Sequence, residues 1–118
     1  MLDTVVTLYP EYVPARAGRA VQSARLGDRT AAHRDAVGCL RRDTAPFTLY
    51  QLAGVYALTS RGEAADRREA LRLLAAAFTA GYRDFAVVAA DADLDALRAD
   101  PEFAKLVGEF RTRAANRE

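Results

Sequence analysis

The chain has 118 residues, of which 51% are hydrophobic and 28% are charged, and its formal net charge at pH 7 is +1. This length is enough to bury one core without disulfides or metal ions, and the composition excludes a disordered chain. Acidic residues are interleaved with basic ones, so no field of a single sign is available to hold nucleic acid or an anionic membrane. We expect an ordered domain with neither of these partners.

The cysteine content and the N-terminus bear on the compartment. Cys39 is the single cysteine, so it cannot close an internal disulfide, and no Cys-x-x-Cys pair exists for zinc or redox chemistry. The N-terminus, MLDTVVTLYPEYVP, has an acid at position 3, no basic start and no long apolar run. It therefore predicts neither a signal peptide nor a membrane-spanning helix, and a cytoplasmic location is expected.

In chain order, apolar residues recur at helical spacing, and the strict alternation of a half-buried strand is absent. The spacing predicts four helices, over residues 14–26, 30–42, 46–60 and 66–80. Pro14 and Pro46 suit a first helical turn, where a missing N–H costs nothing. Gly27 and Gly81 suit helix ends.

The C-terminal part predicts a short helix that holds Leu94 and Leu97, followed by a longer one. Asp100 would cap the longer helix and Pro101 would occupy its first position. One face of this last helix would carry the apolar residues Phe103, Leu106, Val107 and Phe110.

An internal repeat is the most informative feature of the sequence. Five positions of the first helix have counterparts with the same spacing 32 residues later, in the third helix. The pairing matches Pro14, Ala17, Ala20, Val21 and Ala24 with Pro46, Leu49, Leu52, Ala53 and Tyr56. The second and fourth helices match at an offset of 38, which pairs Ala32, Ala36, Cys39 and Leu40 with Ala70, Leu74, Ala77 and Phe78. The change in offset predicts a six-residue insertion in the turn within TSRGEAADRRE.

These residues resemble the tetratricopeptide repeat, which has a large residue, Leu-Gly and Tyr on its first helix and Ala, an aromatic and Ala on its second. The second unit matches better, with Leu49, Leu52-Ala53 and Tyr56 on its first helix. Leu49 stands where Trp is usual, and small residues fill the first unit. The resemblance implies an all-α, right-handed stack of helix-turn-helix repeats.

On this interpretation, residues 14–45 form one repeat and residues 46–83 form a second with a long turn. Residues 84–118 would be a degenerate repeat with C-terminal capping helices, and residues 1–13 the tail of a preceding repeat and a linker. The C-terminal part also resembles the closing repeats of large bacterial multidomain proteins, including serine/threonine kinases. No kinase motif occurs in this chain.

The resemblance also implies a function, because the first helix of each repeat in the family lines a concave groove. The positions carried over are Ala15, Gly18, Gln22 and Arg25 in the first unit and Phe47, Tyr50, Gly54 and Ala57 in the second. We predict partner binding by Gln22, Arg25, Phe47, Tyr50 and Gly54. The Lys and Asn residues that grip a peptide carboxylate in the family are missing from these positions, which favours an apolar or extended peptide. The chain would be a protein-interaction scaffold without catalysis or a cofactor.

Two alternatives remain. The segment could close a longer repeat array with no ligand of its own, and self-association through exposed repeat ends is expected in either case. The second alternative is calcium binding, because Asp91, Asp93, Asp95 and Glu102 occupy positions 1, 3, 5 and 12 of an EF-hand window. Ala96 replaces the required Gly of that loop, so a polar turn is favoured.

Other polar residues receive structural interpretations. His33 and Cys39 lie six residues apart on one helix, about 120° around its axis, so they do not face each other. We predict a packed cysteine and a partly buried histidine. The basic pairs Arg41-Arg42 and Arg67-Arg68 are predicted to be solvated surface.

Overall fold

A computed structural model describes residues 2–9 and 11–116 of the chain. Every regular element in these residues is helical, as predicted. The elements are α1 (Leu2–Leu8), α2 (Val13–Arg25), α3 (Arg29–Leu40), α4 (Pro46–Leu58), α5 (Ala64–Ala80), α6 (Phe85–Ala90), the 3-10 helix η1 (Ala92–Leu97) and α7 (Pro101–Asn116). Pro10 of the expected linker, Met1, and residues 117–118 of the expected cap lie outside the described residues. None of the described helices has both the length and the apolar character needed to cross a bilayer.

The helix boundaries follow the local signals in the sequence, with each predicted end within two residues of its observed position. Both α2 and α4 have a proline in the first turn. Gly27 follows α2 at φ 84° and Gly81 ends α5 at φ 122°, in the region that only glycine enters without strain. The side chain of Asp28 accepts a hydrogen bond from the Ala31 amide at 3.1 Å and so caps α3.

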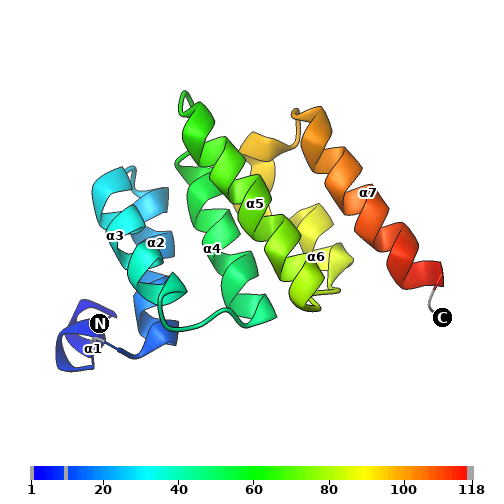
Figure 1. The fold of residues 1–118 in the computed structure, drawn as a ribbon. Helices are drawn as coiled ribbons and strands as arrows, with labels where there is room; N and C mark the ends of the chain where they lie inside the picture. The colour runs from blue at the N-terminus through cyan, green and yellow to red at the C-terminus, as the bar shows by residue number, and fades with distance from the viewer. Residues whose placement is uncertain (1, 10, 117–118) are drawn as a thin grey trace.

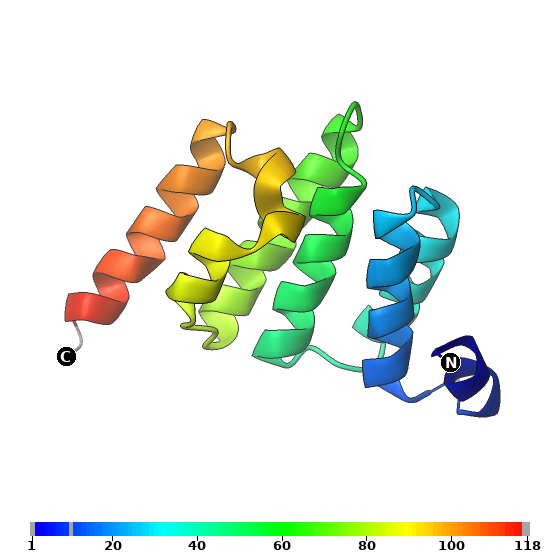
Figure 2. The same cartoon turned by 180° about the vertical axis from the view of Figure 1, so that it is seen from behind.

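The helices lie in two layers (Figures 1 and 2). α2 packs against α3, and α4 packs against α5. α2 also contacts α4, so the two helix pairs lie side by side, with α3 and α5 on the face turned toward the viewer in Figure 1. The opposite face carries α2, α4, η1 and α6, as Figure 2 shows.

The core is built from the residues that the internal repeat predicts. Ala17, Ala20 and Ala24 of α2 are buried, and so are their counterparts in α4, Leu49, Leu52 and Tyr56. The second helices also match in burial, since Ala32, Ala36, Cys39, Ala70, Leu74, Ala77 and Phe78 have no exposed surface. Two predicted pairs differ, because Val21 and Leu40 are only partly buried whereas Ala53 and Phe78 are fully buried, so most but not all of the paired positions are equivalent in burial.

The predicted six-residue insertion is mostly helical, so its assignment to a turn was wrong. The α2–α3 loop has three residues, 26–28, and the α4–α5 loop has five, 59–63. The other four inserted residues extend the helices. Relative to the first helix pair, α4 is one residue longer at its end and α5 begins three residues earlier. Ala64 and Ala65 are strong helix formers, which explains why α5 begins early.

The C-terminal elements agree with the sequence signals. Asp100 accepts a hydrogen bond from the Glu102 amide at 2.9 Å, and α7 begins at Pro101. Leu94 and Leu97 of η1 have no exposed surface, and Phe110 lies 5.4 Å from Phe78 between ring centroids. This segment therefore covers the end of the α4–α5 pair.

Replacement of Leu52 by Ala tests whether the core rests on the repeat positions. Leu52 is fully buried in α4, so Leu52→Ala should lower the free energy of unfolding by about 3 kcal/mol, through lost burial and the cavity left behind. Leu26→Ala, at a leucine that is 85% exposed, should change it by less than about 0.5 kcal/mol. Urea unfolding followed by circular dichroism measures both. Equal effects of the two substitutions would contradict the assigned core.

Candidate functional site: a groove between α2, α4 and the α6–η1 segment

A groove of about 370 Å³ lies on the face shown in Figure 2, between α2, α4 and the α6–η1 segment. Four of the five residues predicted to bind a partner line it, namely Arg25, Phe47, Tyr50 and Gly54. The fifth, Gln22, is exposed on α2 but is not part of the groove lining. Four of the positions carried over from the family resemblance therefore lie on one surface.

Three other positions carried over from the repeat family are covered by the protein itself. Ala15 is 4% exposed and Ala57 is fully buried, so neither is open to a ligand. A Cβ on Gly18 would lie 3.3 Å from Leu2 Cδ1, because α1 packs against this part of α2. On α2, the groove is therefore lined only by residues of the C-terminal half of the helix.

Tyr50 forms a wall of the groove and is not a free donor. Its ring is stacked on Tyr82, with centroids 4.3 Å apart and planes within 5° of each other. Its hydroxyl donates to Asp91 Oδ2 at 2.6 Å. Burial, together with the hydrogen bond to the Asp91 carboxylate, raises the pKa of Tyr50 far above its usual range. The phenol therefore stays protonated and fixed in place.

Arg25 and Asp93 connect α2 to η1 at the edge of the groove. The guanidinium donates from Nε to Oδ1 at 3.1 Å and from Nη2 to Oδ2 at 2.8 Å. The hydrogen bond to Asp93 raises the pKa of Arg25. More than half of the arginine side chain is exposed, so this pair adds little net stability and mainly fixes the position of the guanidinium.

Apolar side chains remain open at the rim of the groove. Phe47 is 64% exposed and Val87, from α6, is 41% exposed. Gly54 lines the groove without a side chain. A Cβ at this position would make an ordinary van der Waals contact with Asp93, at 3.8 Å. The groove therefore offers an apolar rim over an aromatic and glycine floor.

The aspartates of the proposed calcium window have protein partners. Asp91 accepts from Tyr50 and also from the Asp93 amide at 3.0 Å, Asp93 accepts from Arg25, and Asp95 accepts from Arg98 Nε at 2.9 Å. The window itself is folded into η1 and the start of α7. Within the described residues no group of three or more acidic, His or Cys side chains is placed to hold a metal ion. Asp91 and Asp93 therefore hold the side chains of Tyr50 and Arg25, which line the groove.

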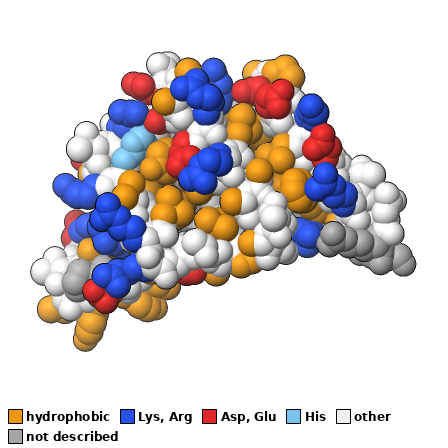
Figure 3. Space-filling view, viewed as in Figure 1, with side chains coloured by type: hydrophobic (Ala, Val, Ile, Leu, Met, Phe, Trp, Pro, Cys, Tyr) orange, Lys and Arg blue, Asp and Glu red, His pale blue; other side chains and the backbone are white. Residues whose placement is uncertain are grey.

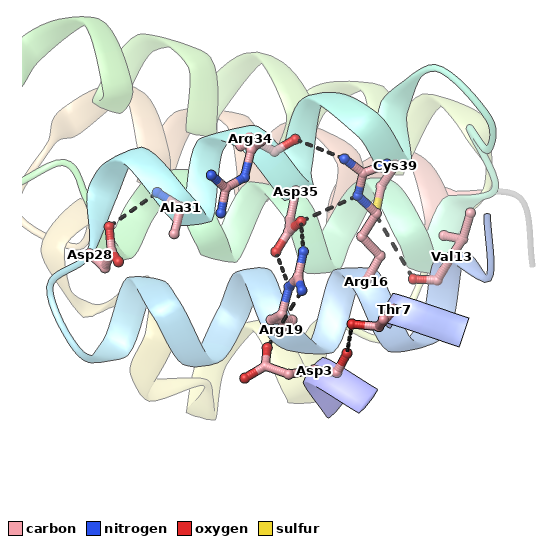
Figure 4. A network of polar contacts seen from close by, with 10 residues as sticks. All are labelled: Asp3, Thr7, Val13, Arg16, Arg19, Asp28, Ala31, Arg34, Asp35 and Cys39. Carbon is pink, nitrogen blue, oxygen red and sulfur yellow. Dashed lines mark hydrogen bonds and ion pairs between the residues drawn. The ribbon is translucent and has the colours of Figure 1, made fainter. Parts of the chain in front are cut away.

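A buried carboxylate that the sequence did not predict lies on α3 and points toward α2 (Figure 4). Asp35 has no exposed surface, and it accepts from Arg19 Nε and Nη2, both at 2.7 Å, and from Arg16 Nε at 3.3 Å. Burial alone would raise the pKa of Asp35, but the hydrogen bonds and charges of the two guanidiniums hold it below its usual range. Leu73 occupies the equivalent position in the second pair and is also buried.

A second polar cluster joins the two helix pairs. Asp66 of α5 accepts from Arg29 Nε at 2.7 Å and from Thr59 Oγ1 at 2.8 Å, and His33 Nε2 lies 3.3 Å from it. The His33 ring stacks on Tyr56 with centroids 4.5 Å apart. Burial lowers the pKa of His33 despite the neighbouring carboxylate, so the ring is neutral at pH 7.

The burial of Cys39 and of His33 agrees with the predictions of a packed cysteine and a partly buried histidine. Cys39 is fully buried, with its sulfur 3.9 Å from the Val13 carbonyl oxygen, and burial raises the pKa of its thiol to about 11. His33 is partly exposed and turns toward Thr59. A buried, protonated thiol is a packing group and a poor nucleophile.

Comparisons with known proteins identify no relative, since no family model, curated protein or solved structure matches the chain. The resemblance to the tetratricopeptide repeat therefore rests on the residue spacing alone.

The Asp35 cluster predicts a specific pH dependence of stability. Because the pKa of Asp35 is depressed in the folded state, its contribution is complete above the unfolded pKa of about 3.9 and is lost as the pH falls through the folded pKa. Asp35→Asn should lower the free energy of unfolding by about 2–3 kcal/mol at pH 7, and by progressively less below about pH 4. Denaturant titrations from pH 7 to pH 2.5 measure this difference.

Asp95→Asn is the matched control, because Asp95 is exposed and pairs with a single arginine. It should change stability by less than about 0.5 kcal/mol at every pH. A pH-independent loss in Asp35→Asn would mean that steric disruption, and not the charge, caused the effect.

Proposed function

We propose that this chain is a protein-interaction module in which two tetratricopeptide-like hairpins, α2–α3 and α4–α5, form a right-handed stack closed by α6, η1 and α7. Its ligand is an extended peptide segment of a partner protein, held in the groove. The observation that carries the proposal is the convergence of Arg25, Phe47, Tyr50 and Gly54, selected by repeat position, on one open groove.

The equivalent burial of the two hairpins supports the repeat interpretation. Ala20 and Leu52 are both fully buried at the same repeat position, as are Ala36 and Leu74 in the second helices. A helix pair of this kind has an apolar face that only a neighbouring pair can cover, which is the packing principle of repeat proteins. The side-by-side arrangement of the pairs agrees with that principle.

The groove chemistry favours a neutral or basic peptide with apolar side chains. Phe47 and Val87 would bury their exposed carbons against the ligand, at about 25 cal/mol for each Å² removed from water. The charged lining groups are Arg25, Asp84, Asp91 and Asp93, whose formal sum is −2, so an acidic segment would be repelled. The stacked tyrosines are already fixed, which reduces the entropy lost on binding.

The proposed setting is the cytoplasm, where the single Cys39 stays reduced. No catalytic step or cofactor belongs to the proposal. Its function would be docking, either of a separate protein or of another part of a larger bacterial protein of the kind that the C-terminal repeats resemble.

Peptide selection against the purified chain tests the groove. Twelve-residue peptides selected from a random display library are synthesised, and their Kd values are measured by fluorescence polarisation. Val87→Ser should weaken binding roughly tenfold, because it removes an apolar contact at the rim. Val37→Ser is a matched control, since both valines are 41% exposed and Val37 lies on the opposite face.

Thermal unfolding of both serine variants establishes that they are folded. Selected peptides whose affinity falls equally in both variants, or in neither, would contradict groove recognition. A library that yields no binder would contradict it as well.

A second candidate function, closure of a longer repeat array, is favoured by the difference between the two ends of the described chain. Val5, Tyr9 and Tyr12 line an apolar hollow of about 360 Å³ near the N-terminal end, where Tyr9 is 65% exposed and Tyr12 is 54% exposed. On α7, Lys105 and Glu109 are exposed, as a capping helix requires. The apolar end could receive another helical hairpin.

A second copy of the chain can also cover that apolar end. We expect the molar mass from light scattering to rise with concentration, and the double substitution Tyr9→Ser/Tyr12→Ser to abolish the rise. Leu26→Ser, which removes a still more exposed apolar side chain elsewhere, at 85% exposure, should leave it unchanged. A wild-type chain that is monomeric at all concentrations would contradict self-association through this end.

A further inference from the structure

A basic hollow of about 690 Å³ lies along the outer side of α3, on the face opposite to the groove. Figure 3 shows Lys and Arg side chains gathered over α3 on this face. The charged lining residues are Arg16, Arg34, Arg41 and Arg42, and no acidic residue is part of the lining. The chain as a whole carries a net charge of only +1, so this hollow is a local concentration of positive charge.

Two of these arginines are free to bind an anion. Arg34 and Arg41 are exposed and make no ion pair with any other described residue. They are seven residues apart, and Arg41 directly follows α3 with a helical backbone conformation, so both lie on the same side of the helix, about 10 Å apart along its axis. Arg42, by contrast, already pairs with Glu11 at 2.6 Å.

Arg16 supplies a third, preorganised charge at the floor of the hollow. Its guanidinium lies directly over Gly38, where a Cβ would overlap with it. The guanidinium is held there by Asp35, at 3.3 Å from Nε, and by the Arg34 carbonyl oxygen, at 3.5 Å from Nη2 (Figure 4). Glycine is a poorer helix former than alanine, and here its missing side chain makes room for the guanidinium of Arg16.

We propose that this basic hollow binds an acidic segment of a partner protein, with carboxylates placed on Arg34 and Arg41 above Arg16. A guanidinium presents two parallel N–H donors that match a carboxylate, and pairs of this kind are short and directional. In an extended chain the carboxylates that face one surface lie at alternate residues, about 7 Å or about 13 Å apart, which the flexible arginine side chains can reach from backbone positions about 10 Å apart. The acidic segment therefore binds at two points, Arg34 on α3 and Arg41 at the C-terminal end of the same helix.

A peptide fits this surface better than a nucleic acid does. No lining residue has an aromatic ring other than the imidazole of His33, so the stacking platforms that bind single-stranded bases are missing from the hollow. The two free arginines would neutralise few phosphates, whereas nucleic-acid affinity grows with the number of phosphates neutralised. The site is independent of the peptide groove, which lies on the opposite face and has the opposite formal charge.

A labelled peptide of known charge tests the proposal directly. The probe is a fluorescein-labelled decapeptide of alternating Glu and Ser, and the matched peptide has Gln in place of Glu. Fluorescence polarisation should show binding of the Glu peptide to the wild-type chain that weakens with added salt, and no binding of the Gln peptide. Arg34→Gln/Arg41→Gln should weaken binding at least tenfold.

Arg61→Gln/Arg68→Gln is the control, because it removes the same charge from two exposed arginines outside the hollow. It should change the Kd less than about twofold. Gly38→Ala should displace Arg16 and weaken binding several-fold while leaving the fold intact, since alanine favours the helix. Its thermal unfolding verifies the fold.

Three results would overturn the proposal. They are no binding of the Glu peptide at low salt, an equal loss in the two double variants, and tighter binding of a single-stranded oligonucleotide that depends on Arg34 and Arg41. The last would assign the hollow to nucleic acid. None of these results bears on the groove, whose ligands are measured through Val87.

Discussion

Burial of α4 on nearly all sides is the constraint on which the rest of the molecule depends. Its sequence, PFTLYQLAGVYAL, is apolar around almost its whole circumference, as a helix enclosed by neighbours requires. It contacts α2, α3, α5 and η1, which together cover it. Leu52, Ala53 and Val55 are fully buried in different directions from the helix axis. Both the groove and the hairpin packing take their geometry from this central helix.

Helix positions and the inward residues could be predicted from the sequence because they follow from local periodicity. Equal spacing on two helices means equal faces, so Ala20 and Leu52 were assigned to the core correctly. The insertion before α5 was misplaced because an offset counts residues without showing whether they continue a helix. The lining residues Arg25 and Phe47 were carried over from the family resemblance, which assigns these positions to one surface formed by the first helix of each repeat.

The polar contacts could not be predicted, because they join residues that only the tertiary structure brings together. Asp35 sits at a repeat position where the second hairpin has Leu73, so periodicity predicts an apolar residue there. The arginines that pair with it, Arg16 and Arg19, resemble any solvated arginine in the sequence. Likewise Asp91 was identified in the sequence only as the first position of a calcium-binding window, and its hydrogen bond to Tyr50 joins residues 41 positions apart.

The two faces of the molecule therefore differ in chemistry because one layer of helices lies on each. The α2–α4 face has exposed Phe47 and Val87 and an excess of carboxylates, whereas the α3 face has Arg34 and Arg41 without partners among the described residues. Asp35 lies between the layers and fixes Arg16 at the basic face. A carboxylate buried in the first hairpin thus also holds a guanidinium at an outer surface. Replacing Asp35 by leucine, as in the second hairpin, would remove that support and leave Arg16 without an ion-pair partner among the described residues and Arg19 with Asp3 alone, at 3.5 Å.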